Sequence, residues 1–392
     1  WQRVTARHAA LRTSFHWERL PHPVQIVHAD FSVPYESRDW RARSSDEQDV
    51  AWQQLCDADR ARGFDLTRPP LQRLLLARTG DTRYRFCWTQ HHLLLDGWSA
   101  AIVLDEVLGA YLGRAVDDRC PRRYRDAVVW IEQQEREQLA VFWRDRLADR
   151  PAVTPLPAGR QLFDGATTPF ACREVERVLS ASGSAAVREL AEREHLTLSS
   201  IMQGAWALAL ARQSGERDVI FGAVVGGRPA QLDGADEMIG VFINTVPVRI
   251  TIDEHEPIGS WLRALQTRQA ESEPFQYGAL AEIQRWSGAG AGAPLFDTLL
   301  NVANYSVSAS LQAPSSEFAV REVRAWEPNN YPLTLVVTPG PCLTLTLLYD
   351  AGRYDVTTVN ALLARLEQLL ATMAVRCDRP VAELHFITAE ET

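Results

Sequence analysis

The chain contains no lysine, and all 41 of its basic residues are arginine. A lysine Schiff base and a lysine nucleophile are therefore excluded as mechanisms. The glycine patterns of Rossmann and P-loop nucleotide sites are absent, so we expect no bound nucleotide and no bound cofactor. No G-x-S-x-G elbow of a serine hydrolase and no H-E-x-x-H zinc motif is found.

Cysteine is scarce and scattered. None of the six cysteines forms a C-x-x-C pair, and their wide spacing disfavours a disulfide scaffold or a zinc ribbon. No apolar run reaches the roughly 18 residues of a membrane-spanning helix, and no signal peptide is visible. We therefore expect a reduced, cytoplasmic protein that does not associate with membranes. The cysteines are Cys56, Cys87, Cys120, Cys172, Cys342 and Cys377.

Length and charge narrow the class of protein further. A chain of 392 residues exceeds the usual size of one hydrophobic core, which favours two lobes. The apolar fraction of 46% and the charged fraction of 23% are ordinary for a globular protein. A net charge of −9 disfavours a protein that binds nucleic acid.

Strand-like and helical stretches alternate along the chain, which predicts a mixed α/β fold. The segment 147–169 has four prolines and no periodicity, and it is the best linker candidate. We therefore predict an N-terminal lobe over 1–150 and a C-terminal lobe over 151–392. Helical periodicity predicts one helix around 184–213.

The stretch TQHHLLLDGWSA, Thr89 to Ala100, contains the two adjacent histidines of the chain. If His91 and His92 end a strand, their side chains point to opposite faces. One ring can then face a cavity while the other braces the turn. Ser99 is predicted to be the N-cap of the helix that follows.

Three interpretations of the pair remain open at this point. His91 and His92 can be a buried structural pair. They can bind a metal together with Asp96, although no further ligand follows at a suitable spacing, so we expect no metal. Alternatively, free N–H groups after the Asp-Gly turn can stabilise an oxyanion beside a neutral histidine, which suits acyl transfer to an amine or alcohol.

The segment HHLLLDGWS resembles the H-H-x-x-x-D-G motif of condensation domains from nonribosomal peptide synthetases. Other segments are similar to family sequence in the same order along the chain, so the resemblance covers nearly all of it. The segments are RHAALRTSF at 7–15, YRDAVVW at 124–130, IGVFINTVPVR at 239–249, PLFDTLLNVANY at 294–305, NNYPLTL at 329–335 and RPVAELHFITAEE at 379–391.

The resemblance implies two lobes like chloramphenicol acetyltransferase, set in a V-shaped pseudo-dimer with a tunnel at their junction. It implies peptide-bond formation between a donor acyl or peptidyl thioester and the α-amine of an acceptor aminoacyl thioester. The implied partners are an upstream donor and a downstream acceptor peptidyl carrier protein, which hold both substrates on phosphopantetheine arms, and an adjacent adenylation domain.

The family motif also implies roles for individual residues. His92 is the expected catalytic histidine, and Gly97 is expected to offer its backbone N–H to the oxyanion. His91 and Asp96 are expected to be structural, with Arg12 as the predicted ion-pair partner of Asp96. The predicted tunnel-lining residues are Trp98, Ser99, Asn244, Asn304 and Asn330.

Rival members of the same superfamily are weighed by their motifs. Epimerization domains usually read Val-Ser-Trp after Asp-Gly, whereas this chain reads Trp98-Ser99, and heterocyclization domains have aspartates in place of the histidines. A catalytically silent docking module would lose the motif.

The chain departs from the family in two places. The first family motif should precede Trp1, so we expect an N-terminally trimmed lobe, and Phe-Glu-Asn-Tyr-Pro appears here as VANYS at 302–306.

Overall fold

The computed structural model describes residues 1–114, 121–149, 153–154, 171–288, 294–303 and 319–384. The chain divides into two compact units. Unit 1 comprises Trp1–Gln134, Arg228–Phe242 and Tyr305–Val323, and unit 2 comprises Glu135–Gly227, Ile243–Asn304 and Arg324–Thr392. The predicted lobe boundary at residue 150 lies outside the described residues and stays a prediction.

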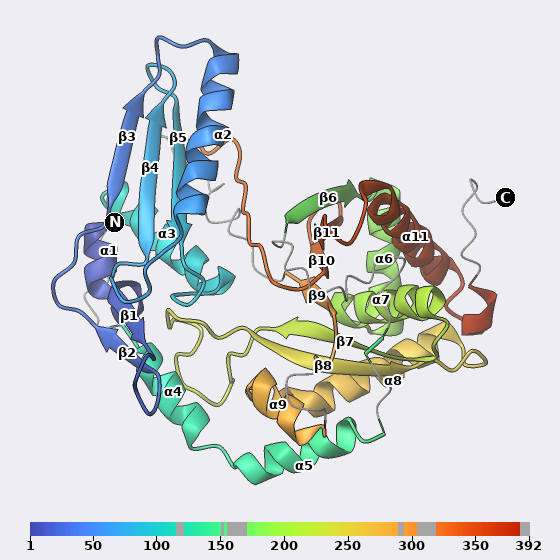
Figure 1. The fold of residues 1–392 in the computed structure, drawn as a ribbon. Helices are drawn as coiled ribbons and strands as arrows, with labels where there is room; N and C mark the ends of the chain where they lie inside the picture. Colours follow the sequence, from blue (N-terminus) through green and yellow to red (C-terminus); the bar gives the residue numbers. More distant parts are fainter. Residues whose placement is uncertain (115–120, 150–152, 155–170, 289–293, 304–318, 385–392) are drawn as a thin grey trace. The chain divides into compact units, whose positions relative to one another are not determined.

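The described part of unit 1 contains a hairpin, a three-stranded sheet and four α-helices (Figure 1). Its helices are α1 (Gln2–Arg7), the 3-10 helix η1 (Ala9–Arg12), α2 (Ser45–Arg62), α3 (Gly97–Tyr111) and α4 (Tyr124–Glu132). Its strands are β1 (Thr13–His16), β2 (Val24–Val27), β3 (Tyr35–Asp39), β4 (Gln72–Arg78) and β5 (Tyr84–Gln90).

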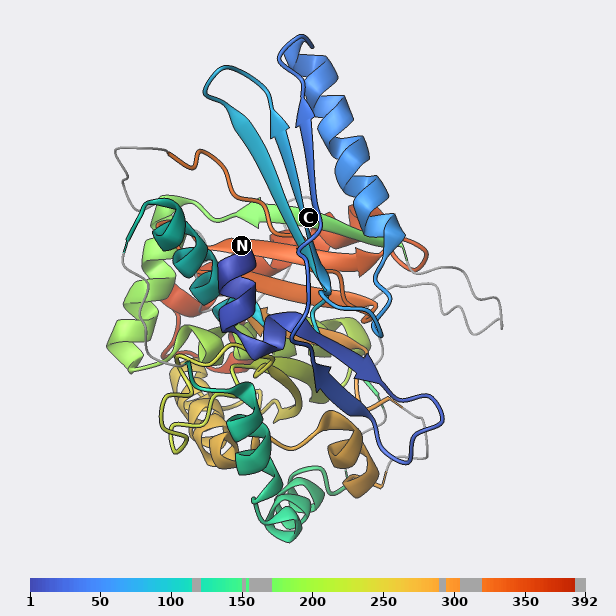
Figure 2. The same ribbon diagram turned by 90° about the vertical axis from the view of Figure 1, so that its left-hand side faces the viewer.

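The three-stranded sheet of unit 1 has the order β3-β4-β5, with β3 parallel and β5 antiparallel to β4. Helix α2 runs alongside the strands in both ribbon views (Figures 1 and 2). It begins with a capping box in which Ser44 and Glu47 satisfy each other's backbone N–H groups. On β5, Phe86 and Trp88 share one face and contact Trp1, with ring centroids 5.7 and 4.8 Å apart; the Phe86 ring is stacked on Trp1 and the Trp88 ring is tilted against it.

Unit 2 is built on one sheet of order β6-β11-β10-β9-β7-β8. Its strands are β6 (Cys172–Val178), β7 (Asp218–Val225), β8 (Asn244–Thr251), β9 (Thr298–Val302), β10 (Leu333–Thr338) and β11 (Thr344–Asp350). Its helices are α5 (Arg136–Arg146), α6 (Ala181–Glu194), α7 (Leu198–Ser214), α8 (Ile258–Ser272), η2 (Glu273–Phe275), α9 (Leu280–Trp286), α11 (Val356–Val375) and η3 (Val381–Glu383).

Both faces of strand β7, in the unit 2 sheet, are buried. On β7, Val219 and Phe221 belong to the large core that also holds residues of α6, α7, α8 and α11. The residue between them, Ile220, belongs to a second core with Trp143 of α5 and Ile283 of α9. Because successive strand residues point to opposite faces, β7 is apolar on both sides, as a sheet covered by helices requires.

The single helix predicted around 184–213 is wrong, because two helices occupy this stretch. Helix α6 ends at Glu194, and its C-cap His195 adopts a left-handed conformation (φ 54°) that stops the helix while backbone N–H groups at the cap bond to the Ala191 and Glu192 carbonyls. Thr197 then caps α7 by accepting the N–H of Ser200 at 3.1 Å. A left-handed histidine leaves no mark on hydrophobic periodicity, so the pattern alone could not reveal the break.

Candidate functional site

The histidine pair lies in a tight turn between β5 and α3. Strand β5 ends at Gln90, so His91 and His92 follow the strand rather than end it. The His91 N–H donates to the Leu71 carbonyl at 3.0 Å, and the Leu94 N–H donates to the His91 carbonyl at 3.0 Å. The strand alternation assumed for the two rings therefore does not apply, and the turn sets their directions.

His91 makes the contacts of a residue that braces this turn. Its Nδ1 accepts the N–H of Leu93 at 3.1 Å, and its ring lies edge-on to Phe64, with centroids 6.1 Å apart. Burial and the neighbouring His92 lower the pKa of His91, so its ring is neutral at neutral pH. Because Nδ1 accepts a hydrogen bond, the proton of the neutral ring lies on Nε2.

His92 is the exposed member of the pair. Its ring forms no hydrogen bond with any residue that the structure describes, so its nitrogens remain available. The chain on the helix side of the turn is fixed by Leu94 and Leu95, which are 2% and 0% exposed and belong to the same core as Leu11 and Val103. The turn is therefore held by the core, and it exposes the His92 imidazole.

Helix α3 begins directly after the turn, and Asp96 is its N-cap. The Asp96 carboxylate accepts the N–H of Ser99 at 2.8 Å, so the prediction that Ser99 is the cap is wrong. Asp96 directly precedes the first helical residue, whereas Ser99 already lies inside α3 and its hydroxyl is bonded to Gly240. The Gly97 N–H has no acceptor among the described residues, and it lies in the first turn, where the helix dipole is positive.

The Asp96 carboxylate is 1% exposed, and its hydrogen-bond donors include three groups of unit 1. Besides the Ser99 N–H, it accepts the N–H of Phe242 at 2.9 Å and a guanidinium N–H of Arg228 at 3.4 Å. A buried carboxylate needs such donors, because an uncompensated charge is costly away from water. The donors from Arg228 and Phe242 fix the start of α3 to the segment Arg228–Phe242.

Arg228 makes more contacts than the ion pair alone. It also donates to the hydroxyl of Ser99 at 2.8 Å and to the carbonyls of Met238, at 3.0 Å, and Ala235. Its guanidinium carbon lies 4.0 Å from the ring centroid of Phe242. Burial lowers the pKa of Arg228, but an arginine remains charged at neutral pH.

Ser99 completes the connection between α3 and this segment. Its hydroxyl, which is 0% exposed, donates to the Gly240 carbonyl at 2.8 Å and accepts the Gly240 N–H at 3.1 Å. Gly240 has no room for a side chain, because a Cβ there would overlap the ring of Tyr124. The Tyr124 hydroxyl donates to the Val241 carbonyl at 2.5 Å. Ser99 is therefore a packed anchor and does not line an open space within unit 1.

The prediction that Arg12 pairs with Asp96 is wrong. The Arg12 guanidinium donates to the carbonyls of Ala6 and His28, at 3.2 and 2.6 Å, and so ties α1 to the hairpin. Arg228 takes the predicted place. The only sequence signal for Arg228 is that an arginine follows shortly after a buried strand. Because the chain contains 41 arginines, this signal does not single out Arg228.

The predicted tunnel-lining residues have different environments. Trp98 is 43% exposed, and its indole N–H donates to the Asp236 carbonyl at 3.0 Å. The Asn244 side chain, in unit 2, donates to the carbonyls of Gln276 and Gly278, each at 2.7 Å, which is a structural role. Asn330 is exposed. Asn304 lies outside the described residues.

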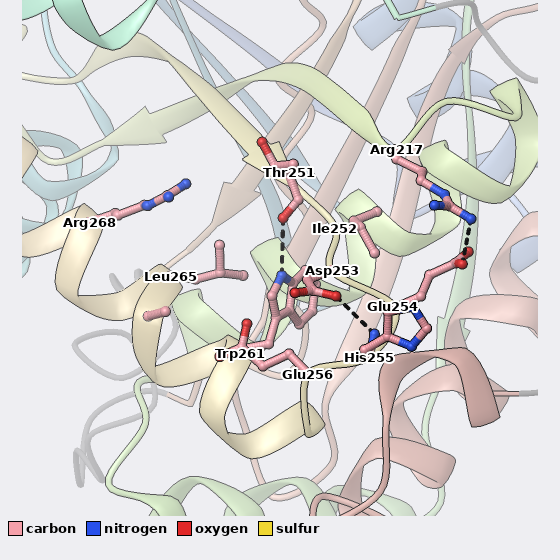
Figure 3. Close-up of a pocket in the computed structure, with 11 residues that line it drawn as sticks. Arg217, Thr251, Ile252, Asp253, Glu254, His255, Glu256, Trp261, Leu265 and Arg268 are labelled. Atoms are coloured by element: carbon pink, nitrogen blue, oxygen red, sulfur yellow. Dashed lines mark hydrogen bonds and ion pairs between the residues drawn. The ribbon is translucent and has the colours of Figure 1, made fainter.

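A hollow of about 410 Å³ in unit 2 contains none of the predicted site residues (Figure 3). Its wall carries an ion pair between Arg217 and Glu254, with 2.6 Å between the charged atoms. The Trp261 indole N–H donates to the Thr251 carbonyl at 3.3 Å. The wall also carries the charged residues Asp253, Glu256 and Arg268.

Two further properties were searched for over the described ranges. No group of three or more His, Cys, Asp or Glu side chains that could hold a metal ion occurs there. Among the helices in that part of the chain, none is both long and apolar enough to cross a membrane.

The whole chain, residues 1–392, matches the family model described as the condensation domain. The chain belongs to the condensation domain family. This condensation domain is 38% identical over 395 residues to a component of the linear gramicidin synthase of Brevibacillus parabrevis, which covers 100% of the chain and 8% of that protein. Against tyrocidine synthase 2 of the same organism it is 30% identical over 398 residues, which covers 99% of the chain and 11% of that protein. The chain thus spans a small part of the curated relatives it matches.

Solved structures support the fold. The first condensation domain of the calcium-dependent antibiotic synthetase, in complex with a substrate analogue, matches with a TM-score of 0.76 and 20% identity, covering 99% of this chain and 89% of that one. The X-domain from teicoplanin biosynthesis matches with a TM-score of 0.79 and 21% identity, covering 97% and 87%. The expected family and the two-lobed α/β fold are confirmed. Condensation domains of nonribosomal peptide synthetases form peptide bonds by acyl transfer, using substrates on carrier proteins.

Proposed function

We propose that this condensation domain joins a donor acyl or peptidyl thioester to the α-amine of an acceptor aminoacyl thioester. An upstream and a downstream carrier protein hold the two substrates on phosphopantetheine arms, and an adjacent adenylation domain belongs to the same assembly. The observation that carries the proposal is the exposed ring of His92, which lies five residues before Gly97 and its available N–H on one rigid turn.

The reaction makes one bond and breaks another. The acceptor amine attacks the donor carbonyl carbon, an N–C bond forms, and the carbonyl oxygen becomes negative. The Gly97 N–H and the positive end of α3 stabilise that oxygen. The C–S bond then breaks, and the donor carrier leaves as a thiol once its sulfur has gained a proton.

His92 handles the proton in this scheme. An α-amine titrates near pH 8, so a fair fraction of the acceptor is neutral before reaction. The ring takes the proton that N–C bond formation makes acidic and returns it to the leaving sulfur. If the ring only positions the amine, its removal costs far less, so the size of the loss separates the two roles.

The buried network around Asp96 supports this chemistry indirectly. It fixes the first turn of α3, and with it the direction of the Gly97 N–H, through Arg228 and Ser99. No residue of a recognisable nucleophile elbow accompanies His92 in the sequence. We therefore propose direct transfer, with no acyl group attached to the chain.

The test incubates the chain with donor-loaded carrier, with acceptor-loaded carrier, and with both, and follows carriers and chain by intact mass spectrometry. The proposal requires elongated product on the acceptor carrier only when both are present. An acyl adduct on the chain after donor alone would refute direct transfer. Inversion of the donor α-carbon without elongation would identify an epimerization domain, and no turnover of any kind would favour a docking module.

The predicted cytoplasmic location and the lack of a bound cofactor stay predictions. A reaction without a bound cofactor agrees with a donor whose acyl group is already activated as a thioester.

A further inference from the structure

The β1–β2 hairpin of unit 1 (Figures 1 and 2) carries three polar side chains on one face. Ser14 on β1 pairs with Ile26 on β2, and His16 lies two residues after Ser14. His28 follows β2, and its N–H donates to the Arg12 carbonyl at 2.9 Å, which continues the pairing by one residue on each strand. Because side chains alternate along both strands, Ser14, His16 and His28 share one face.

The Ser14 hydroxyl lies between the two imidazoles. Its oxygen is 2.9 Å from Nε2 of His16 and 2.7 Å from Nε2 of His28. Ser14 is 0% exposed, whereas both histidines are half-buried and remain partly open to solvent. Neither ring has another hydrogen-bond partner among the residues that the structure describes. The two Nε2 atoms therefore converge on one shared oxygen.

A single hydroxyl proton makes the two rings unlike when both are neutral. The hydroxyl donates its proton to one Nε2 and accepts the Nε2–H of the other ring. The ring that accepts has its own proton on Nδ1 and directs an Nε2 lone pair at the hydroxyl. The other ring gains the same arrangement when its proton moves from Nε2 to Nδ1. Two convergent imidazole lone pairs are the donors that a divalent transition-metal ion binds.

A neighbouring carboxylate adds negative charge to this part of the hairpin. Leu66 accepts the N–H of Phe15 at 2.8 Å, so Asp65, the residue before Leu66, lies beside β1. The Thr67 hydroxyl and N–H donate to Asp65 at 2.7 and 3.0 Å and hold the pKa of Asp65 below its ordinary value. The Asp65 carboxylate also interacts electrostatically with His16. An ionised carboxylate at this place favours a cation beside the rings.

We propose that His16 and His28 bind a divalent transition-metal ion through their Nε2 atoms. The ion takes the place of the proton shared with the hydroxyl, each ring keeps its own proton on Nδ1, and the Ser14 hydroxyl turns aside. With two protein ligands the ion keeps positions open for water or for a donor atom of another molecule, and it binds more weakly than in a four-ligand structural zinc site. The proposal rests on unit 1 alone and does not depend on the proposed reaction.

The test titrates Ni²⁺ into the whole chain, without a histidine tag, and measures binding by isothermal titration calorimetry. Ni²⁺ is the probe because imidazole suits it, whereas zinc and copper ions also bind the thiolates of the six cysteines. His16→Asn and His28→Asn should each lower the affinity at least about 10-fold, because each removes one of the two ligands. His22→Asn is the matched control, because His22 is an exposed histidine between β1 and β2, and it should leave the affinity unchanged.

Two further measurements do not depend on the folding of the histidine variants. Ser14→Ala removes the competing hydroxyl, so it should keep the Ni²⁺ affinity or raise it. In the unsubstituted chain, Ni²⁺ should protect His16 and His28 from modification by diethyl pyrocarbonate, as read by mass spectrometry, while His22 stays reactive. The proposal is overturned if Ni²⁺ protects neither His16 nor His28, or if the folded variants His16→Asn and His28→Asn bind Ni²⁺ as tightly as the unsubstituted chain. Loss of binding in folded Ser14→Ala would also overturn it.

Discussion

Replacing Arg228 by alanine should loosen the start of α3 without touching the histidine turn itself. The variant removes the charged partner of Asp96 and the hydrogen bond to the Ser99 hydroxyl. The Asp96 carboxylate, which is 1% exposed, keeps the backbone N–H groups of Ser99 and Phe242 as donors.

The magnitude follows from this partial loss. Breaking a buried ion pair from one side costs about 3–5 kcal/mol. The 3.4 Å separation is long, and two backbone donors remain, so the lower end of the range, about 3 kcal/mol, applies. A local opening made easier by about 3 kcal/mol accelerates amide exchange roughly 150-fold.

Hydrogen exchange with mass spectrometry measures this effect locally. Peptides that contain the amides of Ser99 and Phe242 should exchange roughly 150-fold faster in Arg228→Ala than in the unsubstituted chain. Arg125→Ala is the matched control, because Arg125 is an exposed arginine of the same unit. Equal exchange in the two variants would show that the Asp96–Arg228 pair does not hold α3, and the reasoning would fail.

Three other changes test neighbouring contacts. Ser99→Ala should lower the free energy of unfolding of unit 1 by about 1–3 kcal/mol, because the Gly240 N–H and carbonyl lose their buried partner; chemical denaturation of the variant measures it, and no change would contradict the anchoring role. Gly240→Ala should lower the melting temperature, because its Cβ would overlap the ring of Tyr124, whereas Gly226→Ala, at a position with open space for a Cβ, should lower it less. Because the pKa of His91 is lower in the folded chain than in the unfolded chain, the unfolded chain takes up the His91 proton at a higher pH. This histidine therefore contributes stability above about pH 6.5, and that stability is lost as the pH falls further. The pH dependence of unfolding should therefore flatten between pH 7 and about pH 5 in His91→Asn, and identical profiles would refute this.

The sequence supported the family, the two-lobed α/β fold and the position of the histidine motif, because these depend on local patterns and on short motifs. It could not support the partner of Asp96. From the sequence alone, Arg12 and Arg228 are equally good candidates for the partner of Asp96. Only the packing of the segment Arg228–Phe242 in the folded unit distinguishes them.

The strand-end assumption for His91 and His92 failed for a related reason. Alternating residues predict that a strand exists, but the strand ends where Leu71 accepts the His91 N–H, one residue after Gln90. The cap was misplaced because Asp96 and Ser99 are both good N-caps, and the burial of Ser99 against Gly240 decides between them.

The most direct test of the central claim compares His92→Ala with Leu93→Ala in a peptide-bond assay with both loaded carriers. Leu93 is the matched control, because it follows His92 in the same turn and its side chain is 45% exposed. If the His92 ring transfers the proton, His92→Ala should slow elongation about 10²–10⁴-fold, while carrier binding and the amide hydrogen exchange of α3 stay unchanged. The elongation rate of Leu93→Ala should stay within about threefold of that of the unsubstituted chain. A loss below about threefold in His92→Ala, with binding unchanged, would contradict the account and leave the ring without a part in the reaction.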